Sequence, residues 1–414
     1  MNISIKNGRL IDPKNGIDAR QDLFIADGRI AAVGQAPAGF VPEREIDAAG
    51  YVVCPGLIDL SARLPSLETE LACAAANGIT TVVCPPDTRP VLDEPSLVER
   101  LIQRAEALGL ARVLPLGALT KGLQGQTLAS MAGLASAGCV AFTQASQPVT
   151  DLQSLYRAMQ YAATYDFAVW LRPQDYQLAK DGVAHDGEMA ARLGLAGIPV
   201  AAETVAIATL IELAKSTGVR LHLMRLSSAA GVAMVREAKA RGVAVSCDVA
   251  AHHLHLAEED IGYFNAQARF DPPLRSVADR AALRFGLAEG VIQAVCSDHT
   301  PMEADGKQVP FGEAEVGARG LELLLPLVLA WAREDGLSLG TALARVTSDA
   351  AAVIGRSDLG HLAVGAVADV CVFDAETEWT ITPDAFTSVG RNSPLAGRTM
   401  SGRIQAVVAG GRLL

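Results

Sequence analysis

The stretch that decides the fold is Cys54-Pro55-Gly56-Leu57-Ile58-Asp59-Leu60-Ser61-Ala62-Arg63-Leu64-Pro65. It opens with a short apolar run that follows Val52 and Val53, which is typical of a buried strand. Asp59, Ser61 and Arg63 come at the end of that strand. If the strand belongs to a parallel barrel, these three side chains lie at the end where functional groups gather.

The chain beyond this stretch alternates short β-branched runs with longer alanine-rich helical stretches, which indicates βαβ units around a parallel sheet. A closed (β/α)8 TIM barrel is therefore expected, with any functional groups at the C-terminal ends of its strands. The eight expected strands lie near 52–58, 79–84, 111–117, 138–143, 167–171, 219–225, 243–248 and 291–297.

The two ends of the chain have a different pattern, with alternating strand-like runs and tight turns. Asn7-Gly8 and Asp27-Gly28 are expected hairpin turns, and Gly410-Gly411 is a third turn. Neither end has enough strands to bury its own face, so the two ends are expected to form one composite β-sandwich domain. Residues 1–52 and 360–414 are assigned to this small domain, and residues 53–359 to the barrel.

Composition limits the classes of partner. The 414 residues carry a net charge of -11, from 46 acidic and 35 basic residues, and contain no basic run. Nucleic acid and membrane are therefore not expected partners. Hydrophobic residues make up 50% of the chain, which favours either subunit contacts, and hence self-association, or a large alanine-rich core.

The cysteines indicate the compartment. There are seven, an odd number without paired spacing, so buried free thiols in a reducing cytoplasm are expected. No leader follows Met1 and no apolar run approaches the ~18 residues of a membrane span, so the expected protein is soluble and cytoplasmic.

The chain resembles the dihydroorotases of the cyclic amidohydrolase superfamily over essentially its whole length. Four segments carry the resemblance: Cys54-Pro55-Gly56-Leu57-Ile58-Asp59, Gly78-Ile79-Thr80-Thr81-Val82-Val83-Cys84, Asp271-Pro272-Pro273-Leu274-Arg275 and Cys296-Ser297-Asp298-His299-Thr300-Pro301. The resemblance implies an amidohydrolase-type barrel with a small β domain.

The resemblance also places the metal ligands and substrate residues of active relatives. The first strand of those relatives supplies His-x-His and then a substrate-gripping arginine, and these positions hold Ser61, Arg63 and Pro65 here. The histidines of strands 5 and 6 fall on Arg172 and Arg225.

Three further positions follow from the same resemblance. The bridging carboxylated lysine or aspartate falls at or near strand 4, on Ala145, and the substrate asparagine falls on Asp87. The strand 8 aspartate, which is ligand and general base in the family, is retained as Asp298 and is followed by His299. Asp59 is retained at the end of the first strand.

These residue types do not suit a hydrolytic metal centre. Zinc needs imidazole, thiolate or carboxylate donors, and a guanidinium has no lone pair to give. We therefore expect no metal, no cofactor and no catalytic residues, but a vestigial pocket. Without metal, Asp298 would be buried and unpaired, so we expect Arg172, Arg225 or Arg63 to pair with it. The alternative is that the arginines point to solvent.

Three other features have more than one interpretation. Ala251-His252-His253-Leu254-His255 is either a metal motif or a loop whose histidines do not converge with a third ligand. Asp298 and His299 are either a catalytic pair that works without metal or an inherited strand end. The segment 306–320 is a lid, a partner-binding loop or a long exposed loop.

The resemblance is strongest to the non-catalytic dihydroorotase-like chains that accompany aspartate carbamoyltransferase in some bacteria. It implies a structural subunit that organises or stabilises the catalytic chain of that enzyme in pyrimidine biosynthesis. One alternative is a metal-free module that binds anions such as pathway metabolites. Another is a cyclic amidohydrolase with an altered metal site.

Overall fold

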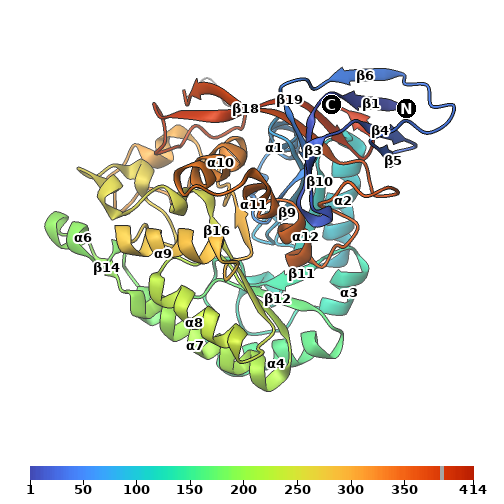
Figure 1. Ribbon diagram of the computed structural model, residues 1–414. Coiled ribbons are helices and arrows are strands. Elements are labelled where there is room, and N and C mark those ends of the chain that lie inside the picture. The colour runs from blue at the N-terminus through green and yellow to red at the C-terminus, as the bar shows by residue number, and fades with distance from the viewer. Residues whose placement is uncertain (383–386) are drawn as a thin grey trace.

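A computed structural model describes residues 1–382 and 387–414. Its centre is an eight-stranded parallel sheet curled into a barrel, with neighbouring strands in the order β17-β16-β15-β12-β11-β10-β9-β8. The expected (β/α)8 fold is confirmed (Figure 1). The strands are β8 (Leu57–Asp59), β9 (Ile79–Cys84), β10 (Arg112–Ala118), β11 (Ala141–Thr143), β12 (Ala168–Leu171), β15 (Arg220–Leu223), β16 (Val245–Ala250) and β17 (Ala294–Cys296).

The barrel closes between its first and last strands. Ala62 forms an isolated parallel bridge with His299 just beyond the ends of β8 and β17. The Arg63 N–H donates to the His299 carbonyl at 2.9 Å, and the His299 N–H donates to the Ser61 carbonyl at 3.2 Å. The residues just after β8 therefore close the barrel by pairing with the residues just after β17. The C-terminal ends of both strands lie at the same mouth.

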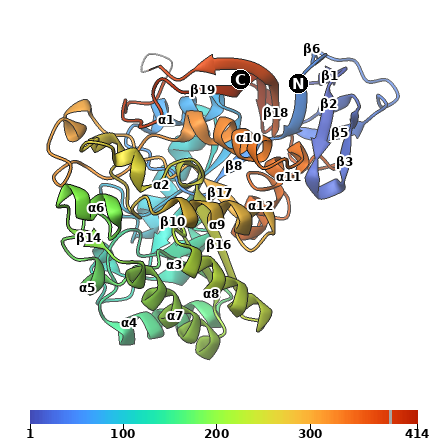
Figure 2. The same cartoon turned by 60° about the vertical axis from the view of Figure 1, so that its left-hand side comes forward.

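Helices surround the barrel and bury its outer face (Figure 2). The helices that follow the strands are α1 (Leu67–Ala76), α2 (Pro95–Leu108), α3 (Met131–Ser136), α4 (Leu152–Thr164), α7 (Val200–Thr217), α8 (Ala229–Ala240), α9 (Val277–Ala288), α10 (Leu324–Glu334), α11 (Leu339–Ala344) and α12 (Ser348–Ile354). An insertion between β12 and α7 contains α5 (Tyr176–Ala179), β13 (Ala184–His185), α6 (Glu188–Leu193) and β14 (Gly197–Ile198).

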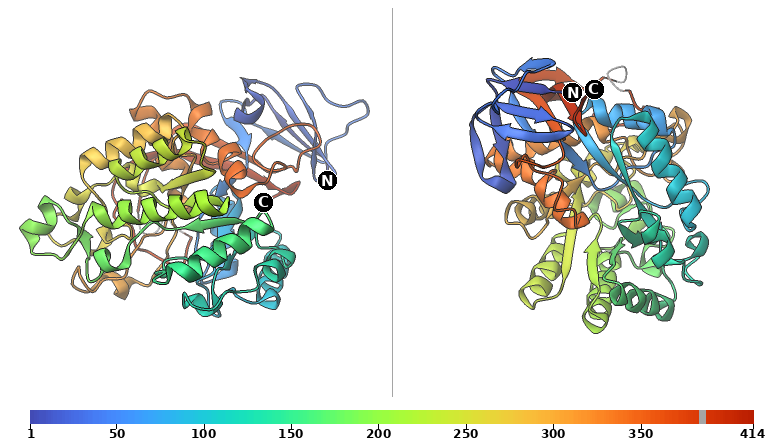
Figure 3. Two further views of the ribbon diagram at one scale, coloured as in Figure 1. Left: turned by 90° about the horizontal axis from the view of Figure 1, so that it is seen from below. Right: turned by 90° about the vertical axis from the view of Figure 1, so that its right-hand side faces the viewer.

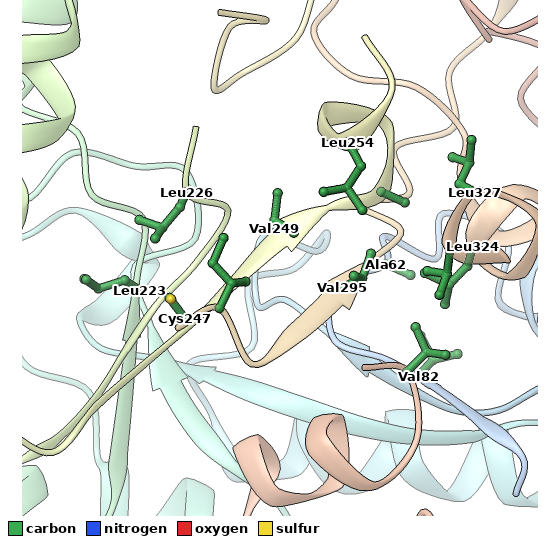
Figure 4. Close-up of a cluster of buried hydrophobic side chains, with 14 of the residues drawn as sticks. Ala62, Val82, Leu223, Leu226, Cys247, Val249, Leu254, Val295, Leu324 and Leu327 are labelled. Atoms are coloured by element: carbon green, nitrogen blue, oxygen red, sulfur yellow. The ribbon is translucent and has the colours of Figure 1, made fainter. Parts of the chain in front are cut away.

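In residues 1–382 and 387–414, seven short 3-10 helices lie in the connections: η1 (Pro13–Asn15), η2 (Lys121–Leu123), η3 (Ala251–Leu254), η4 (Glu258–Ile261), η5 (Ala266–Ala268), η6 (Ala304–Lys307) and η7 (Leu321–Leu323). The main apolar core lies between the barrel wall and the helices. Figure 4 shows Val82 of β9 below Leu324 of α10, and Val295 of β17 between Val249 of β16 and this helix. Burying such side chains contributes roughly 1.5–3 kcal/mol each.

The two ends of the chain form two β-sheets, one from N-terminal strands alone and one from strands of both ends. One sheet has the order β5-β4-β1-β6 and the other β20-β19-β18-β7-β2-β3. The strands are β1 (Ile3–Lys6), β2 (Arg9–Asp12), β3 (Ile17–Arg20), β4 (Leu23–Ala26), β5 (Arg29–Val33), β6 (Arg44–Asp47), β7 (Val52–Pro55), β18 (Val370–Thr380), β19 (Thr399–Ala409) and β20 (Arg412–Leu413). The N- and C-termini lie at this end of the molecule (Figure 3).

Pairing between the ends is direct. β7 runs antiparallel to β18, with Cys54 opposite Cys371. A separate apolar cluster joins residues of both ends, including Ile5, Val53 and Val408. The proposed division into residues 1–52 with 360–414 and residues 53–359 stays a prediction.

One turn differs from the expectation. Asp27-Gly28 and Gly410-Gly411 are hairpin turns with positive φ at both residues. Asn7-Gly8 is not a hairpin, because β1 and β2 belong to different sheets. A Cβ on Gly8 would lie 2.5 Å from Val53 Cγ2, so this glycine permits close packing between the sheets.

All seven cysteines are buried free thiols, as expected. In the described residues, no helix combines the length and the apolar character that crossing a membrane requires.

Candidate functional site

Arg225 and Asp298 form an ion pair at the centre of the mouth. Arg225 follows β15, Asp298 follows β17, and Arg225 Nη1 lies 2.5 Å from Asp298 Oδ1. Their side chains are only 5% and 4% exposed. Burial alone would lower the pKa of Arg225, but the negative charge of Asp298 and of neighbouring groups holds that pKa above its usual value. The guanidinium is therefore permanently charged.

The backbone at the mouth is unusual. Ala145, Arg225 and Asp298 have φ values of 52°, 57° and 47°, a region that residues other than glycine rarely adopt. Each lies just beyond a barrel strand, at the end where active sites of this architecture lie. Such strain persists only where surrounding structure holds it in place, so the mouth keeps the backbone form of a functional site.

Arg63 contacts two carboxylates across the mouth. Its Nε and Nη2 donate to Asp87 Oδ2 at 3.0 and 2.8 Å, and its Nη1 donates to the Thr300 hydroxyl at 3.0 Å. The same Nη1 lies 4.0 Å from Asp298 Oδ1. Asp298 thus has Arg225 as its close partner and Arg63 as a second, more distant cation.

Arg172 pairs with a residue to which the sequence interpretation gave no role. Both of its terminal nitrogens donate to the Asp271 carboxylate, and Gln174 accepts a further bond. Burial lowers the pKa of Arg172, an effect that Asp271 opposes. Asp271 belongs to one of the segments that carried the resemblance, but its position after β16 gave no sign that it would reach Arg172.

Asp59 and Ser61 complete the wall of the mouth. The Asp59 carboxylate accepts hydrogen bonds from the Ser297 N–H at 2.8 Å, the Ser61 N–H at 3.3 Å and the Ser297 hydroxyl. Burial raises the pKa of Asp59 to about 6, against the opposing effect of these bonds. Asp59 therefore joins β8 to β17 and does not face an arginine.

His299 does not pair with its neighbour Asp298. Its Nδ1 accepts the Gly320 N–H at 2.9 Å, so its proton lies on Nε2, which is 2.9 Å from a carboxylate oxygen of Glu70 in α1. Ser388 from the C-terminal segment also binds Glu70. The catalytic-pair interpretation of Asp298 and His299 has no geometric support, because the two side chains have separate partners.

After β11, the fourth barrel strand, the side chain of Ala145 has no atom that could bind a metal ion. Its backbone N–H donates to Thr143 Oγ1 at 3.0 Å. The neighbouring Gln144 accepts a bond from the Thr120 hydroxyl, and its buried Nε2 has no partner in the described residues. Nothing here could bridge two metal ions.

The residues at the mouth do not fit the metal centre of an active dihydroorotase. In the described part of the chain, no three His, Cys, Asp or Glu side chains gather as metal ligands. Of the residues that the resemblance places at ligand positions, Ser61, Arg63, Ala145, Arg172 and Arg225 have no side chain that suits a metal, and Asp298 is the one carboxylate among them. Three guanidiniums instead each pair with a carboxylate, Arg63 with Asp87, Arg172 with Asp271 and Arg225 with Asp298.

The three-histidine segment is part of the packed interior. His253 Nε2 lies 3.1 Å from the Pro272 carbonyl and His255 Nε2 lies 2.8 Å from the Leu327 carbonyl, so both nitrogens carry protons. The His252 ring stacks on Phe270 with centroids 4.0 Å apart. Burial lowers the pKa of His253 and of His255 to about 4 and that of His252 further.

Hydrogen bonds from Arg269 and Asn392 hold the segment after β17, residues 300–317, against neighbouring parts of the chain. Arg269 Nη1 donates to the carbonyls of Phe311 and Ala314 at 3.1 and 2.7 Å. Asn392 Nδ2 donates to the carbonyls of Thr300 and Gly317 at 3.1 and 3.3 Å. These contacts make the segment more than a long exposed loop.

Comparison with known proteins shows the family to which the chain belongs. Residues 50–230 match the dihydro-orotase-like family. A dihydroorotase-like protein of Pseudomonas aeruginosa is 44% identical over 421 residues, covering 100% of this chain and 99% of that protein. A dihydroorotase-like protein of Pseudomonas putida is 42% identical, and a protein of Syntrophotalea carbinolica named dihydroorotase is 40% identical, each with the same coverage.

Among solved structures, the L-hydantoinase of Arthrobacter aurescens has a TM-score of 0.87 at 24% identity, covering 99% of this chain and 95% of that one. This likeness bears on the fold alone. The full-length identity to the Pseudomonas proteins shows that this chain belongs to the dihydroorotase-like family.

Proposed function

We propose that this chain is a non-catalytic member of its family, a structural subunit that assembles with aspartate carbamoyltransferase and stabilises it. The observation that carries the loss of chemistry is the buried pair of Arg225 and Asp298. The aspartate that would bind metal and take a proton is engaged by a permanent cation. A carboxylate so engaged is a poor ligand and a poor general base.

The intact scaffold supports the structural half of the proposal. The barrel is closed by backbone hydrogen bonds at the mouth, and the segment after β17 is fastened by Arg269 and Asn392. In this proposal the side chains at the mouth have no catalytic role, and the hydrogen bonds around them keep the mouth rigid. A frame of this kind suits a subunit whose role is to present surfaces.

Two alternatives have less support. An anion-binding module needs positive charge that is not already neutralised, but each mouth arginine has an aspartate partner. A hydrolase with an altered metal site agrees with the name dihydroorotase given to relatives such as that of Syntrophotalea carbinolica. It would need donors that the mouth does not offer.

Two measurements test the proposal. The first is metal content of the purified protein together with dihydroorotate hydrolysis, with an active dihydroorotase as positive control. We expect less than a tenth of a metal ion per chain and no turnover above the uncatalysed rate. Stoichiometric metal, with turnover that Asp298→Ala abolishes, would establish the altered hydrolase instead.

The second measurement is size-exclusion chromatography of the transcarbamoylase from the same organism, with and without this chain. We expect a co-eluting complex and higher transcarbamoylase activity in its presence. If the two proteins elute separately and the activity is unchanged, the structural role is wrong.

A further inference from the structure

A cleft of about 690 Å³ lies beside the mouth and shares with its ion pairs only Arg63 and Asp87. Its walls are the segment after β8, the segment after β9 and one face of α2. Arg63 and Asp87 stand at its boundary with the mouth. The remaining lining residues are Leu64, Pro65, Ser66, Leu67, Glu68, Pro85, Thr88, Arg89, Pro90, Leu92, Leu97, Arg100, Leu101, Arg104 and Pro301.

Three arginines in this cleft have no carboxylate partner. Arg89, Arg100 and Arg104 are exposed, and in the described residues none of them forms a side-chain hydrogen bond or ion pair. The carboxylates in the lining are Glu68 and Asp87, and Asp87 is already bound by Arg63. The cleft is therefore cationic on a chain whose net charge is -11.

The helix wall of the cleft alternates cations with apolar side chains. Leu97, Arg100, Leu101 and Arg104 occupy positions i, i+3, i+4 and i+7 of α2, which fall on one helix face. Leu97 and Leu101 are half-buried and pack on the main core, so they form a fixed apolar floor. Arg100 and Arg104 stand about 6 Å apart along the axis above that floor.

We propose that this cleft docks an acidic segment of a partner polypeptide. Carboxylates of that segment pair with Arg100, Arg104 and Arg89, and its apolar side chains pack on Leu97 and Leu101. A polypeptide fits better than a small anion, because the arginines are exposed and come from two segments: Arg100 and Arg104 lie one helical turn apart on α2, and Arg89 lies in the segment after β9. A small-ligand site instead encloses its ligand among converging groups. Arginine over an apolar floor is the composition of protein interfaces.

The inference deepens the proposed function, because it gives the partner subunit a place to bind. Its test uses the double variant Arg100→Glu/Arg104→Glu. The matched control is Arg44→Glu/Arg192→Glu, which reverses two exposed arginines outside the cleft and changes the net charge equally. Circular dichroism and melting temperature verify that both variants are folded.

The first probe is a synthetic peptide of alternating glutamate and leucine, titrated by calorimetry at low and high salt, with citrate as the small-anion comparison. We expect salt-sensitive binding of the peptide to the wild type and the control, weakened at least tenfold in Arg100→Glu/Arg104→Glu. No binding, or equal binding to all three proteins, overturns the proposal. Citrate binding as tightly as the peptide, with the same arginine dependence, replaces it with a small-anion site.

The second probe is the transcarbamoylase, titrated with the same three proteins, and it separates the two proposals. If it binds none of them while the peptide result holds, the proposed function fails and the cleft proposal stands. If it binds all three equally, the cleft proposal fails and the proposed function stands. Binding weakened only in Arg100→Glu/Arg104→Glu supports both.

Discussion

Arg225 and Asp298 meet across the centre of the barrel mouth, where almost no solvent reaches either side chain. Arg225→Met would leave the Asp298 carboxylate buried, with Arg63 Nη1 at 4.0 Å and Arg172 farther away as the remaining cations near it in the described residues. We expect the variant to lose about 3–5 kcal/mol of unfolding free energy, the cost of breaking a buried pair from one side. Urea unfolding at neutral pH measures it.

The control for this prediction is Arg225→Met/Asp298→Asn, which removes both charges. Replacing a whole buried pair is often nearly neutral, so the double variant should recover most of the loss. A double variant as unstable as Arg225→Met alone would mean that packing, and not charge, is responsible.

His253 predicts how the protein responds to acid. Burial lowers its pKa in the folded state to about 4, whereas an unfolded histidine titrates near 6.5. Its contribution to stability is therefore fully present above about pH 6.5 and is lost as pH falls through about 4. The difference corresponds to about 3 kcal/mol.

His253→Gln removes this titration while keeping a donor for the Pro272 carbonyl. We expect the fall in unfolding free energy between pH 7 and pH 4 to be smaller than in the wild type by about 3 kcal/mol. Urea unfolding at the two pH values gives the comparison. An unchanged fall would show that His253 does not supply this part of the acid sensitivity.

At the scale of elements, Gly56 joins β7 of the small sheet to β8 of the barrel. A Cβ there would lie 2.2 Å from Thr80 Oγ1 and 2.4 Å from Thr80 Cγ2 in β9. Gly56→Ala should therefore lower the unfolding free energy by about 1–3 kcal/mol through overpacking. Thermal unfolding of the purified variant measures the effect.

The matched control is Gly340→Ala in α11, where the nearest atom would lie 3.7 Å from the new Cβ. Alanine is the better helix former, so this variant should be as stable as the wild type or more stable by up to about 1 kcal/mol. Equal losses in both variants would contradict the steric explanation for Gly56.

At the scale of the whole molecule, the last strands hold the two ends of the chain together. β19 pairs with β18 along most of its length and contacts α10 of the barrel. Removing residues 399–414 would expose the apolar cluster shared by both ends, which includes Val408. We expect this truncation to yield insoluble protein or to lose cooperative unfolding.

Removing only Leu413 and Leu414 is the control, because these residues are 37% and 44% exposed. That shorter truncation should keep a single thermal transition within a few degrees of the wild type. Soluble yield and thermal unfolding decide between the outcomes. A soluble, cooperatively folded protein without residues 399–414 would contradict the shared role of the two ends.

The sequence by itself determined the barrel and the residue types at its mouth. Strand and helix periodicities are local properties, so seven of the eight barrel strands could be predicted within a few residues. The first expected strand, 52–58, was wrong, because residues 52–55 form β7 of the small sheet and the barrel strand is β8. The chemistry of a guanidinium is also independent of its surroundings, so Arg172 and Arg225 were unsuitable as metal ligands before any geometry was known.

Only the tertiary structure decided which charges meet. The sequence allowed any of three arginines to pair with Asp298. In the structure Arg225 makes the closest contact with Asp298, Arg172 pairs with Asp271, and Arg63 pairs with Asp87. His299 and Glu70 are 229 residues apart in the chain. Likewise Asn7-Gly8 has a hairpin sequence but lies between two sheets. Partners so distant in sequence are chosen by the closure of the barrel and the packing of the sheets, which no local pattern records.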